Sequence, residues 1–305
     1  MGTRRLFRWI AALALPFALV FGTVLVVDPY NYFGLFHAIP DTLKRKNLYH
    51  DGRTMPFSNL LWKLIELRHT PQDRILLGDS RLSHFDLDHL ERVSGHRWYN
   101  LGVPGGNTRT MADLFTYAAQ APLKEVLVQV SFRGMNRGMD WDLYGEPRLL
   151  LDQPFLYLSN RRVLEATVLN LCSALLPATV RYDVLPPDQW QRVLDMERAN
   201  ATDFTPDSAA FGRLERIAAR CRAMGCALRF VEYPTHPDVQ RIYAEAGLEP
   251  QRTAYLERLR RLAPVIDLDR PGLFAADKAL WRDPLHLTTD AQRAVIDTVW
   301  AAGGR

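Results

Sequence analysis

A serine stands at the end of a short apolar stretch, where its hydroxyl could act as a nucleophile. In "ILLGDSRLSHFD", residues 75–86, the apolar run predicts a buried strand, and Ser80 follows it after Gly78 and Asp79. A hydroxyl there lies at the carboxyl edge of the strand, beside the backbone N–H groups that begin the next helix. The same position suits a serine that only caps that helix. The motif by itself leaves both interpretations open.

A histidine and an aspartate near the C-terminus can complete the chemistry that Ser80 would begin. A nucleophilic serine needs a base, and the base needs a group that orients it. In "WRDPLHLTTDAQRAV", Asp283 and His286 are three residues apart, just before the last predicted helix. We expect His286 to act as the base and Asp283 to fix its tautomer. The alternative is an Asp-Pro turn followed by a surface histidine.

Two loops between these segments offer groups that could stabilise an oxyanion, which acyl chemistry requires. "YNLGVPGGNT" follows the second predicted strand, and its glycines, Gly105 among them, allow close approach of the backbone. "FRGMNRG" follows the third strand and contains Asn136, a candidate side-chain donor. The alternative for both sequences is that their glycine and asparagine residues only form the turns of ordinary loops. His236, after a later strand, is a weaker candidate for a substrate contact, and its alternative is a surface-loop histidine.

The other polar residues indicate no metal, cofactor or nucleic acid. The three cysteines form no C-x-x-C pair, and the histidines between residues 84 and 96 lack the spacing of metal ligands. The net charge of +4 is small for 305 residues, and the basic residues are spread along the chain. A nucleic-acid-binding protein would show clustered basic stripes. We therefore expect no metal, no cofactor and no nucleic-acid partner.

Strand and helix patterns alternate from residue 71 to residue 301, which predicts the fold that must position these residues. Strand-type apolar runs occur in "RILLGD", "RWYNLG", "EVLVQVS", "ALRFVEYP" and "PVIDL", with helical spacing between them. Gly95 and Gly225 are placed to end two of the helices. Such alternation predicts an α/β fold with a mostly parallel sheet covered on both faces. Ligands in such folds bind at the carboxyl ends of the strands.

The N-terminal residues predict a membrane anchor. The first nine residues carry three arginines, and an uncharged, mostly apolar run extends from Ile10 to Val27. This run is about the minimum length for a transmembrane helix, and the flanking positive charge places residues 1–9 in the cytoplasm. We predict an uncleaved anchor over residues 10–27, followed by a connector over residues 28–70. A cleaved signal peptide is the alternative.

Residues 139–205 interrupt the alternation of strands and helices. They are rich in aromatic residues and prolines and contain the apolar segment "VLEATVLNLCSALLPATV". We interpret them as a helical lobe inserted into the domain over residues 71–301. A second membrane span is the alternative, although Glu165 and Asn170 interrupt the apolar run.

The order of the candidate blocks resembles the SGNH (GDSL-like) hydrolase superfamily. That superfamily has a G-D-S block, a glycine ending an N-x-x-x-x-G stretch, a G-x-N-D block and a final D-x-x-H block. The matching segments here are Gly78-Asp79-Ser80, Asn100 to Gly105, Gly134 to Arg137, and Asp283 to His286. The third block departs from the pattern, because Arg137 replaces its aspartate. The resemblance covers residues 70–301 and implies a three-layer α/β/α sandwich.

The resemblance also implies roles for the residues. Ser80 would be the nucleophile, His286 the base and Asp283 its orienting group. The N–H of Ser80, the N–H of Gly105 and the side chain of Asn136 would form the oxyanion hole.

The N-terminal anchor and "DPYNYFG" are similar to bacterial membrane-anchored SGNH-like proteins of alginate O-acetylation and of D-alanylation of lipoteichoic acid. That similarity implies a single-pass protein of the bacterial inner membrane whose catalytic domain faces the periplasm or exterior. It would act on a cell-surface polysaccharide or related acylated polymer, as a serine esterase or an O-acyltransferase, with a membrane acyl-transfer protein as a candidate partner. A non-catalytic scaffold or carbohydrate-binding subunit of a polymer-export assembly is the alternative.

Overall fold

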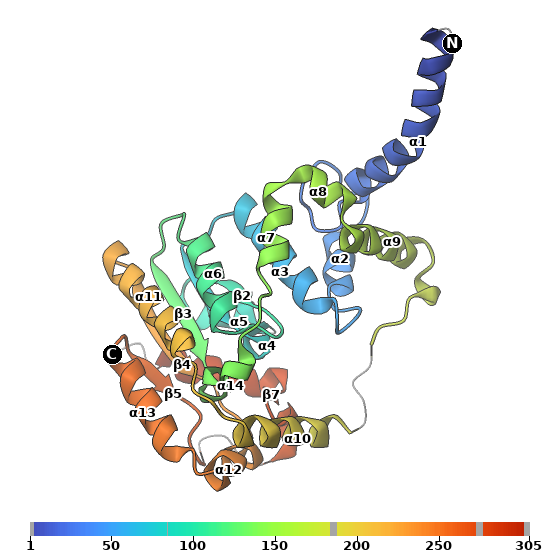
Figure 1. Ribbon diagram of the computed structural model, residues 1–305. Helices are drawn as coiled ribbons and strands as arrows, with labels where there is room; N and C mark the ends of the chain where they lie inside the picture. The colour runs from blue at the N-terminus through green and yellow to red at the C-terminus, as the bar shows by residue number, and fades with distance from the viewer. Residues whose placement is uncertain (1–2, 84, 184–187, 273–276, 302–305) are drawn as a thin grey trace. The chain divides into compact units, whose positions relative to one another are not determined.

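The computed structural model describes residues 3–83, 85–183, 188–272 and 277–301 (Figure 1). The chain divides into two compact units. Unit 1 comprises residues 1–69 and 145–184, and unit 2 comprises residues 70–144 and 185–305. Unit 1 therefore combines the predicted anchor and connector with most of the predicted lobe. Unit 2 contains every strand that the structure describes and all of the candidate site residues.

Unit 2 is built on a parallel sheet of five strands in the order β2-β1-β3-β4-β5. Each strand coincides with one of the predicted apolar runs, which confirms the predicted mostly parallel sheet. Their bounds are β1 Arg74–Gly78, β2 Tyr99–Gly102, β3 Glu125–Val130, β4 Ala227–Glu232 and β5 Val265–Asp267. Because all five strands run in one direction, their carboxyl ends meet at a single edge of the sheet.

Helices cover both faces of this sheet. On one face, a buried cluster joins Leu76 and Leu127 of the sheet to side chains of α5 and α14. On the other face, α6 and α11 pack against each other and against β1 and β4, and α13 contacts β5. The bounds are α5 Leu87–Ser94, α6 Thr108–Ala118, α11 Ser208–Met224, α13 Glu249–Arg260 and α14 Thr289–Ala301. The result is the three-layer α/β/α arrangement that the sequence predicts.

The helix boundaries follow the sequence signals. Gly95 and Gly225 end α5 and α11 with φ angles of 71° and 68°, in the left-handed region that glycine adopts without strain. The remaining elements of unit 2 are the helices α10 and α12 and several short segments. They are α4 Ser80–Ser83, η1 Phe132–Met135, η2 Arg137–Met139, α10 Gln189–Thr202, α12 Pro237–Glu245, η4 Lys278–Leu280, β6 Trp281–Asp283 and β7 His286–Leu287.

Unit 1 is helical in its described residues. Its elements are α1 Thr3–Val27, α2 Asp41–Asn47, α3 Met55–His69, α7 Gly145–Asp152, α8 Pro154–Ser159, α9 Arg161–Leu175 and η3 Pro177–Thr179. Among the described residues, α1 is the one helix that is long and apolar enough to cross a membrane. The alternative of a second span falls on α9, which has 15 residues, whereas a span needs about 20.

Candidate active site

Ser80 lies at the carboxyl end of β1, where the strand gives way to the short helix α4. The turn is tight because its backbone is packed against neighbouring groups. A Cβ atom on Gly78 would lie 2.5 Å from Gln129 Oε1, and one on Gly106 would lie 2.8 Å from the carbonyl oxygen of Gly78. Neither position can accept a side chain without a shift of its surroundings. The turn therefore presents Ser80 at the edge of the sheet, partly exposed.

Ser80 and His286 are joined by a hydrogen bond, although 206 positions separate them in the chain. The distance from Ser80 Oγ to His286 Nε2 is 2.7 Å. His286 begins β7, which pairs with β6 in a two-stranded antiparallel sheet. Its side chain is 24% exposed, so the imidazole is open to a substrate on one side.

Asp283 holds the other side of the imidazole. Both of its carboxylate oxygens lie 2.8 Å from His286 Nδ1. Its Oδ1 also accepts the backbone N–H groups of Leu285 and His286, and only 6% of its side chain is exposed. Burial alone would raise the pKa of Asp283, but the hydrogen bond and charge of His286 keep that pKa below its ordinary value. An ionised Asp283 accepts the Nδ1 proton, which leaves Nε2 to accept the proton of Ser80.

The loop after β2 lies directly against the turn that carries Ser80. The N–H of Val103 donates to the carbonyl of Gly78 at 3.1 Å. Gly105, with a φ of 71°, has its carbonyl fixed by Trp141 Nε1 at 2.9 Å. Within the part of the chain that the structure describes, the N–H groups of Ser80 and Gly105 have no hydrogen-bond acceptor. Both are therefore available to an oxyanion.

Asn136 has a different set of partners from the one that its predicted oxyanion role requires. Its Nδ2 donates to Asn200 Oδ1 at 2.6 Å and to the Asn200 carbonyl at 3.1 Å. Its Oδ1 accepts the N–H of Thr205 at 3.1 Å, and the residue forms an isolated bridge with Pro206. To face a substrate at Ser80, the amide would have to leave Asn200.

His236 is buried behind the loop that carries Asp283 and His286. It is 3% exposed, and its backbone N–H donates to the carbonyl of Pro284 at 2.9 Å. Its ring meets the rings of Trp190 and Trp281 edge to face. Neither sequence interpretation, substrate contact or surface histidine, describes this arrangement, in which His236 supports the loop.

An ionic clamp that the sequence motifs did not predict joins Asp79 and Arg81, the two residues on either side of Ser80. Arg81 Nη2 donates to Asp79 Oδ2 at 2.7 Å, and Arg81 Nε lies 3.0 Å from Asp79 Oδ1. Gln129 of β3 accepts the N–H of Asp79 at 2.8 Å and donates to its Oδ2 at 3.2 Å. Burial alone would raise the pKa of Asp79, but Arg81 and then Gln129 lower it well below the ordinary value. A glutamine inside the apolar strand "EVLVQVS" was the available sequence signal for this clamp.

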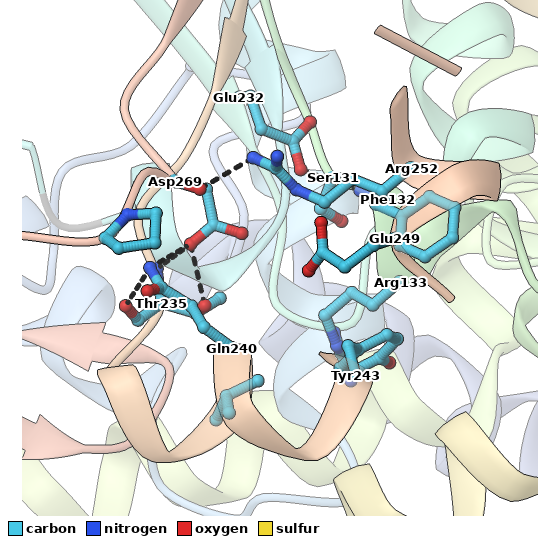
Figure 2. A pocket seen from close by; sticks show the side chains of 12 residues that line it. Ser131, Phe132, Arg133, Glu232, Thr235, Gln240, Tyr243, Glu249, Arg252 and Asp269 are labelled. Atoms are coloured by element: carbon cyan, nitrogen blue, oxygen red, sulfur yellow. Dashed lines mark hydrogen bonds between the residues drawn. The ribbon is translucent and has the colours of Figure 1, made fainter. Parts of the chain in front are cut away.

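A separate cavity of about 160 Å³ opens at the same edge of the sheet, beyond the ends of β3, β4 and β5 (Figure 2). Glu232 and Asp269 line it together with Arg252, and Asp269 Oδ1 accepts hydrogen bonds from Thr235 and Gln240. Ser80 and His286 do not line this cavity. Among the described residues, no cluster of His, Cys, Asp and Glu has the arrangement of a metal site.

Comparison with known proteins gives matches among solved structures only. No family model and no curated protein matches the chain. A protein provisionally named as a platelet activating factor from Streptococcus pneumonia is 12% identical, with a TM-score of 0.44 over 86% of this chain and 96% of that one.

Two further matches carry GDSL names. A protein provisionally described as lipolytic and of the G-D-S-L family, from Desulfitobacterium hafniense, is 9% identical, with a TM-score of 0.41 over 75% of this chain and 99% of that one. A GDSL-like lipase from Bacteroides thetaiotaomicron is 10% identical, with a TM-score of 0.37 over 76% and 86%. Because the TM-scores are below 0.5, we base the function on the geometry of the site alone.

Proposed function

We propose that this chain is a serine acyl-ester enzyme of the SGNH type, with Ser80 as nucleophile, His286 as general base and Asp283 as the group that orients it. The observation that carries the proposal is the continuous hydrogen-bonded chain from Ser80 Oγ through His286 to Asp283. A capping serine would not need a histidine at its hydroxyl, and a surface histidine would not have a buried carboxylate at its Nδ1. The geometry thus favours an enzyme over a non-catalytic scaffold.

The reaction follows from the arrangement of these groups. Ser80 Oγ attacks the acyl carbonyl carbon while its proton passes to His286 Nε2, and the ionised Asp283 stabilises the imidazolium that forms. The N–H groups of Ser80 and Gly105 stabilise the oxyanion. Collapse of the intermediate breaks the ester bond, and His286 returns the proton to the departing alcohol. An acyl group is left on Ser80.

The second half of the reaction repeats these steps with a different oxygen nucleophile. His286 takes a proton from water in a hydrolase, or from a hydroxyl of a surface polymer in an O-acyltransferase, and that oxygen attacks the acyl carbon. Ser80 then leaves with a proton from His286. Both reactions use the same three residues, so the acceptor distinguishes them and the triad does not.

We propose further that α1 anchors the enzyme in a bacterial inner membrane and that the catalytic unit faces outwards. The length and apolarity of α1, and the three arginines before its apolar run, support this topology. The substrate would then be an acylated glycan or related polymer of the cell surface, with an acyl-transfer membrane protein as a candidate partner.

The first test compares the full chain in detergent with its Ser80→Ala variant. An activated acetyl ester serves as substrate, and mass spectrometry of a rapidly quenched sample detects an acyl group on Ser80. We expect turnover and adduct in the parent and neither in Ser80→Ala. Ser94→Ala, a matched change outside the site, should behave like the parent. Full turnover by Ser80→Ala would contradict the proposal.

A second measurement separates hydrolysis from transfer. The isolated acyl-enzyme is mixed with buffer alone or with a neutral polysaccharide in the same buffer. Release of the free acid at equal rates in both samples indicates a hydrolase. Acyl esters on the polysaccharide, formed at the expense of the free acid, indicate a transferase.

A further inference from the structure

The helix α9 buries several polar residues, and on its outer side it exposes apolar residues beyond an Arg161–Glu165 ion pair, which is unusual for a surface helix. Its buried residues include Thr167, Asn170 and Ser173. Its exposed residues include Val168, which is 59% exposed, and Leu175, which is 74% exposed. A surface helix of a water-soluble domain normally buries its apolar stripe and exposes its polar one. The exposed stripe of α9 therefore indicates a surrounding that is not water.

The buried polar side of α9 is held by specific hydrogen bonds, so the helix is fixed in this orientation. Asn47 of α2 donates to Asn170 Oδ1 at 2.7 Å and accepts from Ser173 Oγ at 3.1 Å. Tyr182 also donates to Asn47 Oδ1 at 2.7 Å. Rotating α9 to bury Val168 and Leu175 would break these buried contacts. The apolar side must therefore stay outside.

Exposed apolar residues are concentrated in this part of the molecule. Among the described residues outside α1, eight of the twelve exposed large hydrophobic side chains lie in unit 1, the smaller unit. Phe155 of α8 is the most exposed of them, at 78%. An exposed apolar area of this kind marks a contact with a membrane or a partner.

The helices α8 and α9, which carry these exposed side chains, pack against the candidate transmembrane helix. Both α8 and α9 contact α1, whose buried residues, Val24 and Val27, lie at its C-terminal end (Figure 1). Asp28 makes this junction rigid, because its carboxylate accepts the N–H groups of Tyr32 and Phe33 and the hydroxyl of Tyr157. The helices α8 and α9 thus lie beside the C-terminal end of α1, where its apolar run ends.

An open groove runs along the same side of α9. It has a volume of about 520 Å³, and its apolar lining includes Leu164, Val168 and Cys172. Arg181 also lines the groove, as do Arg161 and Glu165, which form an ion pair. An apolar surface with an arginine at its border suits the boundary between acyl chains and anionic headgroups, where long basic side chains reach the phosphates.

We propose that the exposed apolar side of α8 and α9 lies in the surface layer of the bilayer that α1 spans. The helices lie flat at the interface and do not cross it. This proposal rests on the membrane anchor proposed above and is independent of the catalytic triad. It also accounts for the apolar segment "VLEATVLNLCSALLPATV" as an interfacial helix.

Spin labels on the full chain test this placement. Cysteine variants Val168→Cys and Leu175→Cys, in a Cys172→Ser background with the buried Cys221 and Cys226 retained, are reconstituted in phosphatidylethanolamine–phosphatidylglycerol vesicles without other proteins. Oxygen concentrates in lipid and a nickel chelate stays in water. We expect both labels to collide more often with oxygen than with the chelate.

Two control positions make the result decisive. Met196→Cys in unit 2 replaces another exposed apolar side chain of a helix and should show the opposite preference, for the nickel chelate. Leu13→Cys in α1 should prefer oxygen. If the α1 label prefers oxygen while both α9 labels prefer the chelate, the interfacial placement is wrong. If the α1 label also prefers the chelate, the anchor and the interfacial placement both fail, while the esterase test stands apart.

Discussion

The turn after β1 and the loop after β3 follow neighbouring parallel strands at one edge of the sheet, yet they use their polar groups differently. In the first, Asp79 is bound by Arg81 and Gln129, and Ser80 is left to His286. In the loop after β3, the side chain of Asn136 is hydrogen-bonded to Asn200 of α10. A position at the carboxyl edge of the sheet therefore does not by itself establish a role in the candidate site, because the partners of each side chain decide what it can do.

The two segments also differ in how they are anchored. The clamp of Asp79 joins a carboxylate to a guanidinium, 2% of whose side chain is exposed. The loop after β3 is held by Glu232, whose Oε1 accepts the N–H of Phe132 at 2.8 Å and whose Oε2 accepts the hydroxyl of Tyr255 at 2.9 Å. Burial and then the charge of Asp269 raise the pKa of Glu232 to about 7. The first anchor is charged at neutral pH, and the second titrates there.

The largest effect is expected from His286→Ala. Removal of the base leaves Ser80 without a proton acceptor, and the loss of kcat for acyl-ester hydrolysis should be on the order of 10⁴-fold. His89→Ala, which changes a histidine paired with Asp297, should leave kcat unchanged. The two rates are measured with the same activated ester, and a loss of less than about tenfold in His286→Ala would remove the histidine from the mechanism.

A large loss of stability is expected from Arg81→Leu. The substitution leaves the Asp79 carboxylate buried without its cation, which costs about 3–5 kcal/mol of the free energy of unfolding. Arg198→Leu breaks an exposed pair with Asp195 and should cost under about 1 kcal/mol. Denaturant titrations of the detergent-solubilised proteins give both values. Equal costs would show that the clamp does not hold the turn.

We expect the stability of the protein to depend on pH through Glu232, which anchors the loop after β3. The raised pKa means that folded Glu232 keeps a proton between its ordinary pKa of 4.5 and about 7, where the unfolded chain has lost it. Glu232 therefore contributes stability that is present below pH 4.5 and declines as pH rises through this window, by about 1.4 kcal/mol per pH unit.

Glu232→Gln should remove that decline, since an amide has no proton to lose. The measurement is the free energy of unfolding at pH 5, 6 and 7 for the parent, for Glu232→Gln and for Glu215→Gln, a surface control paired with Arg258. Parallel pH profiles for the parent and Glu232→Gln would refute the assignment.

The smallest effect on rate is expected from Asn136→Ala. Its amide is hydrogen-bonded to Asn200, so we expect less than about a tenfold change in kcat and a loss of about 1–3 kcal/mol in stability. An oxyanion donor would cost about 10²–10³-fold in kcat when removed. A loss of that size, with the protein folded, would restore Asn136 to the oxyanion hole and make the two segments alike.

Local sequence patterns are sufficient to predict the sheet and the position of the candidate nucleophile. Apolar runs of four to six residues that alternate with helical spacing form β1 to β4, and left-handed glycines end α5 and α11. These features are local, because periodicity and the backbone freedom of glycine act over a few residues. The spacing of Asp283 and His286 is also local, since the aspartate accepts the N–H of the histidine three positions later.

Which polar groups meet across long separations in the chain depends on how the elements pack. The tertiary structure brought Ser80 within 2.7 Å of His286, joined Gln129 to Asp79 and turned Asn136 towards Asn200. It also fixed the polar side of α9 on Asn47, which the sequence pattern alone does not show. The physical reason is that a polar side chain takes the partner that the packed elements bring within about 3 Å, and the chain does not encode that distance in neighbouring residues.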